Sequence, residues 1–535
     1  MVLAVLAAPG RGGGICEVNN SMSFGALPLA AAVFSVAVLL SVVLTLLVRH
    51  LAARWGLVDK PDNRRKLHGS PTPLGGGVAI YLTTVIVLGG LALLHTPWQN
   101  ILWATSHDTI ALLIAGAVIV AVGILDDRIA LRGRVKLLGQ IGAVSILVFA
   151  GQRIERLALF GHEFELGVMA IPFTIFWLLG AINALNLLDG IDGLASTLGL
   201  IMIITIGVMA QIINQDPVPI IALVFACSIL GFLVFNFPPA TIFLGDAGSM
   251  LIGLVVGSLA IRGALKGPGT VLLAAPLAVW TIPIFDSLAA IVRRKLTGRS
   301  IYATDRGHMH HRLLGLLGSN RRVLLSIATF CLLTSLATVL SVALRSDLIA
   351  LLSCAAIVTI LIVTGIFGRA ELSLVVNQMR NLGASLVQPA GKAGRVRQAR
   401  IHLQGNRDWG PIWKSLIDAV EPLSLLEIRL DVNVSRAQEG YHAFWQRPGG
   451  DEQDRPWRLE VPLLVGGQTV GSLVLVGRHG DRAISEEMQA VALRLEAFDQ
   501  QLRQLIEEPA TVVLSGRVSG EGGKPSESLT RSRPR

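Results

Sequence analysis

The sequence predicts an all-α, polytopic membrane protein with about eleven transmembrane helices and a small soluble α+β domain near its C-terminus. Three observations support this fold class. Of the 535 residues, 52% are hydrophobic and 15% are charged, and the mean hydropathy is +0.62, far above that of ordinary globular chains. Apolar stretches of about 20 residues, the length that a bilayer core requires, recur along the chain. After Arg369 the pattern becomes that of a water-soluble protein.

The expected spans are apolar stretches separated by short polar loops. They cover residues 26–48, 74–94, 109–125, 135–151, 168–185, 194–213, 218–235, 243–261, 270–292, 323–344 and 347–367. The chain is therefore divided into an N-terminal segment 1–25, a membrane domain 26–368, a linker 369–408, an accessory domain 409–510 and a disordered tail 511–535. The N-terminal segment is expected to be disordered or to precede the true start, since Met22 is an alternative start.

The accessory domain is expected to combine strands with a helix. Residues 425–434 alternate like a strand, and the stretches 457–464 and 469–476 flank a Gly-Gly pair in the manner of a hairpin. Residues 484–507 have the apolar spacing of a helix. Its aromatic side chains are expected to pack in its core, and its ligand or protein partner is left open.

The net charge of +10 is explained by loops on one side of a membrane. Base-reading motifs are absent, so nucleic acid is not an expected partner. Lys and Arg concentrate in the loops 49–66, 128–136 and 293–322, and the opposite loops hold few. The positive-inside rule makes the first set cytoplasmic. With an odd number of spans in an inner membrane, the N-terminus lies outside and the accessory domain lies in the cytoplasm.

Acidic and amide residues gather at the cytoplasmic ends of these spans, where ionisable residues are candidates for a functional site. Asp126 and Asp127 end the third span, where a pair of carboxylates can bind a cation; a solvated helix end is the alternative interpretation. Asn183, Asn186, Asp189 and Asp192 recur every three residues, which places them along a shared helix face. Such a polar stripe favours a functional interpretation.

Two further motifs complete the candidate site. Asn236 lies just before a Pro-Pro pair, and Asp246 lies in a Gly-Asp-Ala-Gly-Ser turn that suits a metal or a phosphate; a helix N-cap is the alternative. One basic loop contains Arg306, His308, His310 and His311 within six positions, which indicates a diphosphate clamp or a metal site.

Lys66 opens a loop that is rich in proline and glycine. Such a loop can present backbone amides to a phosphate, although the Gly-Lys-Ser/Thr of a P-loop is missing. Several carboxylates with a phosphate substrate favour Mg²⁺, with Mn²⁺ as an alternative, because hard cations prefer oxygen ligands.

These motifs, in this order over roughly residues 50–320, resemble the polyprenyl-phosphate N-acetylhexosamine-1-phosphate transferase family (the glycosyltransferase family 4 type). The resemblance implies that Asp126, Asp127 and Asp246 bind magnesium and, with His308, form the catalytic set. It further implies substrate-binding roles for a second group: Lys66, Asn183, Asn186, Asp189, Asp192, Asn236, Arg306, His310 and His311. Asp126 is also a candidate base for the lipid phosphate, and a covalent aspartyl-phosphate route is the alternative.

The form Asp-Arg-Gly-His-Met-His-His at 305–311 resembles the GlcNAc-phosphate branch. The implied reaction moves N-acetylhexosamine-1-phosphate, most simply GlcNAc-1-phosphate, from a UDP-sugar to undecaprenyl phosphate and releases UMP. Two rivals stay open: the phospho-MurNAc-pentapeptide translocase and, from another class, a secondary transporter. Residues 301–304 depart from the family pattern, which leaves the sugar open, and a homodimer also stays open.

Overall fold

The computed structural model describes residues 27–59, 71–159, 162–264, 278–296 and 308–369, a few residues between 371 and 379, and the ranges 397–404, 407–420, 425–434, 439–447, 457–465, 468–477 and 484–507. The chain forms two compact units. The expectations for residues 1–25 and 511–535 lie outside the described residues.

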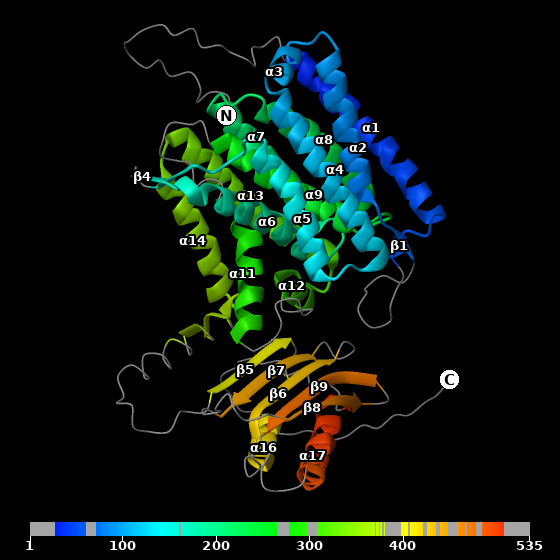
Figure 1. Cartoon of the computed structure of the whole chain (residues 1–535), viewed down its shortest axis with the longest axis vertical. Coiled ribbons are helices and arrows are strands. Elements are labelled where there is room, and N and C mark those ends of the chain that lie inside the picture. Colours follow the sequence, from blue (N-terminus) through cyan, green and yellow to red (C-terminus); the bar gives the residue numbers. More distant parts are fainter. Residues whose placement is uncertain are drawn as a thin grey trace, which may run out of the picture. The chain divides into compact units, whose positions relative to one another are not determined.

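The first unit is a bundle of helices (Figure 1). Its helices are α1 (Leu27–Arg54), α2 (Gly76–Leu93), α3 (Gln99–Ala104), α4 (Ser106–Ile129), α5 (Gly133–Phe149), α6 (Ala170–Leu188), α7 (Leu194–Ile212), α8 (Val218–Asn236), α9 (Gly245–Ala264), α11 (Thr281–Leu296), α12 (Met309–Leu317), α13 (Asn320–Leu344) and α14 (Asp347–Val363). Two small hairpins pair β1 (Val58–Asp59) with β2 (Thr72–Pro73), and β3 (Arg156–Leu159) with β4 (His162–Glu165).

Among the described residues, eight helices are long and apolar enough to cross a membrane: α1, α2, α4, α6, α7, α8, α9 and α13. The expected spans near 135–151, 270–292 and 347–367 correspond to the shorter helices α5, α11 and α14, of 17, 16 and 17 residues. The protein is therefore a multi-pass membrane protein, and the count of eleven spans stays a prediction.

Helix α9 lies at the centre of the bundle and is its most buried span. Small residues let its neighbours approach closely. A Cβ atom at Gly123 of α4 would come within 2.2 Å of the Ala247 Cα, and one at Gly77 of α2 would come within 2.3 Å of the Gly248 backbone nitrogen. These contacts fix the start of α9, which carries Asp246, against the end of α4, which carries Asp126 and Asp127.

The loop before α2 is built into the same region through its backbone. Phe243 N–H donates to the Pro73 carbonyl (2.9 Å), and the amides of Gly76 and Gly77 donate to the carbonyls of Phe243 and Leu244 (3.1 and 3.2 Å). These two amides are therefore occupied by protein acceptors. The expected presentation of loop amides to a phosphate does not apply to them.

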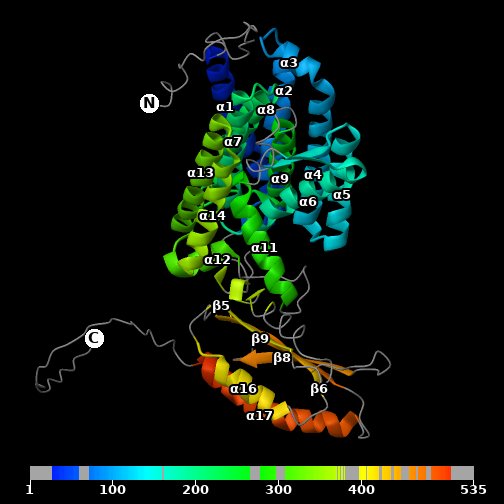
Figure 2. The same cartoon turned by 90° about the vertical axis from the view of Figure 1, so that its left-hand side faces the viewer.

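The C-terminal part of the chain contains a five-stranded sheet with the order β5-β7-β6-β9-β8. Its elements are β5 (Arg397–Gln404), α16 (Gly410–Val420), β6 (Leu425–Val434), β7 (Glu439–Gln446), β8 (Trp457–Val465), β9 (Gln468–Gly477) and α17 (Ile484–Glu507). The expected strands and terminal helix of this domain are present, and Figure 2 shows both helices on one face of the sheet. Strand β5 lies within 369–408, the range expected as a linker. Trp409, Trp413, Tyr441 and Trp445 are buried, as expected of core residues.

Candidate active site

The end of α4 and the start of α9 are joined through Asp127. Its Oδ1 accepts a hydrogen bond from the Asp246 backbone N–H (2.9 Å), so it acts as a cap for α9. Its Oδ2 is buried and has no hydrogen-bond partner. The Asp126 Oδ1 accepts from the Leu131 N–H (2.7 Å). The two expected acidic motifs are thus brought together, although the sequence separates them by more than a hundred residues.

Lys136 of α5 is the cation between these carboxylates. Its Nζ lies 2.8 Å from the Asp126 Oδ2 and 3.0 Å from the Asp246 Oδ2, and it donates to the Asn186 Oδ1 (3.0 Å). The Lys136 side chain is 17% exposed, so water competes only weakly with these contacts. A single ammonium group therefore joins α4, α5, α6 and α9.

The amides of α6 complete this polar layer. Asn186 Nδ2 donates to the Asp246 Oδ1 (2.5 Å) and the Ser249 Oγ (2.9 Å). Asn183 exchanges hydrogen bonds with Gln140 of α5, at 2.9 and 3.3 Å. Asn186 therefore orients the carboxylate of Asp246, whereas Asn183 fixes α6 against α5.

Asp189 and Asp192 follow the end of α6. Burial, and then the negative charges of Asp246, Asp127 and Asp192, raise the pKa of Asp189 well above its ordinary value. The Asp192 Oδ2 accepts a hydrogen bond from the Ala240 N–H (3.1 Å). The region thus has more carboxylates than cations, which favours binding of an added cation.

The histidines are held by a carboxylate of α11. His308 Nδ1 lies 2.7 Å from the Asp286 Oδ2, and the Met309 N–H donates to the Asp286 Oδ1 (2.7 Å). Asp286 is fully buried. Because both of its oxygens are used, Asp286 fixes the orientation of the His308 ring and the start of α12 together.

His310 connects the histidines to the acidic stripe. Its ring is 2% exposed, and neither ring nitrogen has a hydrogen-bond partner. A Cβ atom at Gly190 would come within 2.1 Å of the His310 Nε2, so the ring lies directly against the backbone beside Asp189. Burial, and then the charge of His311, lower the pKa of His310 to about 3. His310 is therefore neutral at physiological pH and is not a fixed cation.

One described residue among those predicted, Asn236, stands apart from this arrangement. Asn236 is buried, accepts from the Ser196 Oγ (2.9 Å) and donates to the Ile242 carbonyl (3.0 Å), so it supports the turn before α9. Lys66 and Arg306 lie outside the described residues.

Comparison with known proteins identifies the family. The family model described as "Glycosyl transferase family 4" matches residues 109–264, which contain most of the acidic site. A Bacillus subtilis (strain 168) protein named "Probable undecaprenyl-phosphate N-acetylglucosaminyl 1-phosphate transferase" is 35% identical over 296 residues, covering 55% of this chain and 80% of that protein. The chain belongs to glycosyl transferase family 4.

Two further proteins are similar to this chain over about half of its length. A Mycobacterium tuberculosis (strain ATCC 25618 / H37Rv) protein named "Decaprenyl-phosphate N-acetylglucosaminephosphotransferase" is 35% identical over 307 residues, covering 52% of this chain and 74% of that protein. An Enterococcus hirae protein named "Phospho-N-acetylmuramoyl-pentapeptide-transferase" is 33% identical over 255 residues, covering 46% and 76%. The family resemblance expected from the motifs is confirmed.

Two residues of this family 4 site, Lys136 and Asp286, belong to no motif that marks them as functional in the sequence. Lys136 is one of the loop cations that indicate the orientation in the membrane. Asp286 falls within an expected apolar span, and a lone carboxylate there is the signal that could have identified it.

The same helix α11 also carries a buried ion pair. Arg293 pairs with Glu371, which lies beyond α14, and Arg312 of α12 lies 3.8 Å from the same carboxylate. Through α11 and α12, this pair connects the segment after α14 to the elements that hold the histidines.

Proposed function

We propose that this protein transfers N-acetylhexosamine-1-phosphate, specifically GlcNAc-1-phosphate, from a UDP-sugar to undecaprenyl phosphate and releases UMP. A lipid phosphate oxygen attacks the sugar-side phosphorus, and the bond from that phosphorus to the UMP oxygen breaks. This is the first membrane step of a cell-surface polysaccharide pathway.

One observation carries the proposal: polar side chains from three other helices, α4, α6 and α9, converge on the Lys136 ammonium group of α5. Asp126, Asp246 and Asn186 all contact it, and Asp127 caps the helix that carries Asp246. Phosphoryl transfer depends mainly on positioning and on neutralising phosphate charge. A rigid layer of carboxylates and one cation at shared helix ends is suited to both tasks.

The donor set fits a magnesium ion. Among the described residues no three carboxylate or imidazole groups converge as a ready metal cage. Mg²⁺ is commonly held by one or two carboxylates, with waters and substrate phosphates completing its shell. The buried, unpartnered Asp127 Oδ2 and the excess of carboxylates favour such an ion. We expect Asp126, Asp127 and Asp246 to hold it, with Mn²⁺ as a substitute; when bound, it would neutralise charge on the diphosphate.

Side chains of the protein supply the other functions of the site. Lys136 balances the carboxylates and offers a positive charge to a phosphate. Asp126 has its two oxygens occupied by Lys136 and the Leu131 N–H, so its carboxylate is held in a fixed orientation. Neutral His310, with two free ring nitrogens beside Gly190, can bind the sugar or diphosphate by hydrogen bonds. His308, oriented by Asp286, presents its other ring nitrogen in a defined direction.

The site is expected on the cytoplasmic side of an inner membrane, because the loops 49–66, 128–136 and 293–322 carry most of the Lys and Arg. This location lets a soluble nucleotide-sugar meet a lipid acceptor. The same rule places the N-terminus outside.

The deciding experiment measures transfer of radiolabel from a panel of UDP-sugars to undecaprenyl phosphate by the purified protein. Labelled lipid and UMP from UDP-GlcNAc are the expected result. Labelled lipid only from UDP-MurNAc-pentapeptide would assign the protein to the peptidoglycan translocase reaction. Substrate flux without UMP would favour the transporter alternative and overturn the proposal.

A further inference from the structure

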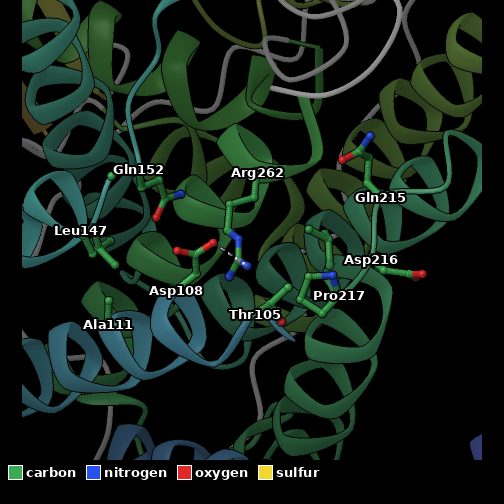
Figure 3. A pocket seen from close by; sticks show the side chains of 12 residues that line it. Thr105, Asp108, Ala111, Leu147, Gln152, Gln215, Asp216, Pro217 and Arg262 are labelled. Carbon is green, nitrogen blue, oxygen red and sulfur yellow. Dashed lines mark hydrogen bonds and ion pairs between the residues drawn. The ribbon is translucent and has the colours of Figure 1, made fainter. Parts of the chain in front are cut away.

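A pocket that contains both polar and apolar side chains lies far from the site described above. It has a volume of about 160 Å³ and is shown in Figure 3. Its wall is formed by the start of α4, the end of α5, the turn between α7 and α8, and the end of α9, and it includes the ion pair between Arg262 and Asp108.

The pocket and the active site lie at opposite ends of the same helices. Helix α9 begins with Asp246 and carries Arg262 in its last turn. At 1.5 Å per residue, these positions are roughly 24 Å apart along the axis, close to the thickness of a hydrocarbon core. Helix α4 likewise has Asp108 in its first turn and Asp126 near its end. The pocket therefore opens at the headgroup level of the leaflet opposite the active site.

Arg262 supplies an unsatisfied donor in this pocket. Its Nη2 donates to the Asp108 Oδ2 (3.3 Å), whereas its Nη1 is buried and has no hydrogen-bond partner. The Arg262 side chain is 10% exposed. A buried charged donor without an acceptor is costly, and a guanidinium group matches the paired oxygens of a phosphate.

Two carboxylates lie closer to solvent than this guanidinium group. The Asp108 side chain is 51% exposed, and Asp216 is exposed, with its carboxylate pointing away from Arg262 in Figure 3. An inner cation with outer carboxylates complements a headgroup that carries a phosphate and, beyond it, an ammonium group. A purely anionic headgroup would meet the two carboxylates unfavourably.

The surrounding surface is suited to a lipid. Ile110 of α4 and Phe149 of α5 are exposed beside the pocket residues Ala111 and Ala150, and Trp103 is exposed on α3, the short helix before α4. Exposed apolar side chains with a Trp among them are typical of the boundary between acyl chains and headgroups. Acyl chains could thus remain in the membrane while the headgroup enters the pocket.

We propose that this pocket binds the headgroup of a zwitterionic phospholipid with a primary amine, its phosphate on Arg262 and its ammonium group near Asp108 and Asp216. The site is independent of the sugar-phosphate transfer proposed above. It gives the protein a specific lipid contact in the leaflet opposite the active site.

The first test uses the wild-type full-length protein in detergent, so it does not depend on a variant folding. Equal amounts of phosphatidylethanolamine, phosphatidylglycerol and phosphatidylcholine are added, and native mass spectrometry counts the retained lipids. We expect phosphatidylethanolamine to be retained about fivefold over the other two, because only it offers both a phosphate and N–H donors. Equal retention of all three lipids would overturn the proposal.

The second test uses variants that elute as monodisperse protein. Arg262→Gln should reduce retention of phosphatidylethanolamine about tenfold, and Arg262→Lys should reduce it less. Asp108→Asn should reduce the preference for phosphatidylethanolamine over phosphatidylglycerol.

Arg345→Gln, which removes an exposed arginine after α13, is the matched control and should leave the retention of all three lipids unchanged. Unchanged retention in folded Arg262→Gln would contradict the assignment. An Arg262-dependent rise of Tm with inorganic phosphate, without lipid retention, would assign the pocket to free phosphate instead.

Discussion

The ring of His310 lies directly against the backbone of Gly190, with no room for a side chain between them. This contact joins α12, which carries two of the histidines, to the turn after α6, which carries Asp189 and Asp192. The two halves of the site are therefore positioned by packing and not only by charge.

Gly190→Ala should separate these halves. The added methyl group would displace the His310 ring, and misplacement of a binding group by about 1 Å costs on the order of a hundredfold in rate. We expect a large fall in kcat/KM for sugar-phosphate transfer, measured with UDP-GlcNAc and undecaprenyl phosphate. Gly180→Ala is the matched control, since a Cβ atom there meets nothing within 4 Å. Near-normal activity of Gly190→Ala would show that His310 is not part of the site.

Asp246→Asn should abolish magnesium-dependent release of UMP. The substitution removes the charge that faces Lys136 and Asn186 while preserving the shape of the side chain. UMP release is measured in detergent over a range of Mg²⁺ concentrations. Glu165→Gln, a change in the β3–β4 hairpin, should leave turnover intact. If Asp246→Asn turns over normally, the metal and phosphate assignment of this carboxylate is wrong.

Lys136→Met should lower both activity and thermal stability. The carboxylates of Asp126 and Asp246 would lose their shared cation and repel each other. In the Asp246→Asn background the loss of Tm should be smaller, because one of the two charges is already gone. Additive losses of Tm in the double variant would indicate that the two side chains do not interact.

Asp286→Asn should reduce kcat with little change in KM for the nucleotide-sugar. The Asp286 carboxylate contacts His308 Nδ1 and is itself fully buried. Its loss therefore affects the orientation of the ring and not the contacts with substrate. Misplacement of a functional group by about 1 Å costs on the order of a hundredfold in rate. Steady-state kinetics of Asp286→Asn and the longer Asp286→Glu provide the measurement. A rise in KM alone would assign Asp286 a binding role.

Stability should fall as the pH is lowered from about 6.5 toward 5 because of His310. Its pKa is lowered to about 3 by burial, against an ordinary value of 6.5, so between these values the unfolded chain binds a proton that the folded chain does not. The destabilisation is absent above pH 6.5 and is bounded by about 1.4 kcal/mol per pH unit below it. Tm is measured for the wild type and for His310→Gln from pH 7.5 to 5. Tm of the variant should depend less on pH than Tm of the wild type. The same pH dependence in both proteins would show that His310 does not cause the loss of stability.

The sequence predicts much of this arrangement because membrane spans and polar motifs are local signals. Apolar length places most of the spans within a few residues of their helices. The three-residue spacing predicts one helix face for Asn183, Asn186, Asp189 and Asp192, but α6 ends at Leu188, so the two aspartates lie beyond the helix and that part of the prediction is wrong. The role of Lys136 could not be predicted, because a lysine near a helix start is explained equally well by membrane orientation. The contacts of Asn236 are tertiary, and no local pattern distinguishes a turn support from a ligand. The Gly190–His310 contact likewise depends on packing between segments more than a hundred residues apart.

The buried pair between Glu371 and Arg293 has a consequence for regulation. It anchors the chain, where it leaves the last described helix of the bundle, to the same helix that carries Asp286. The position of the His308 ring therefore depends on a carboxylate that follows α14 in the chain and makes no contact with the acidic layer that the structure records. A substitution at Glu371 should thus alter turnover through the orientation of this ring, while the contacts of Lys136 with Asp126 and Asp246 stay as they are.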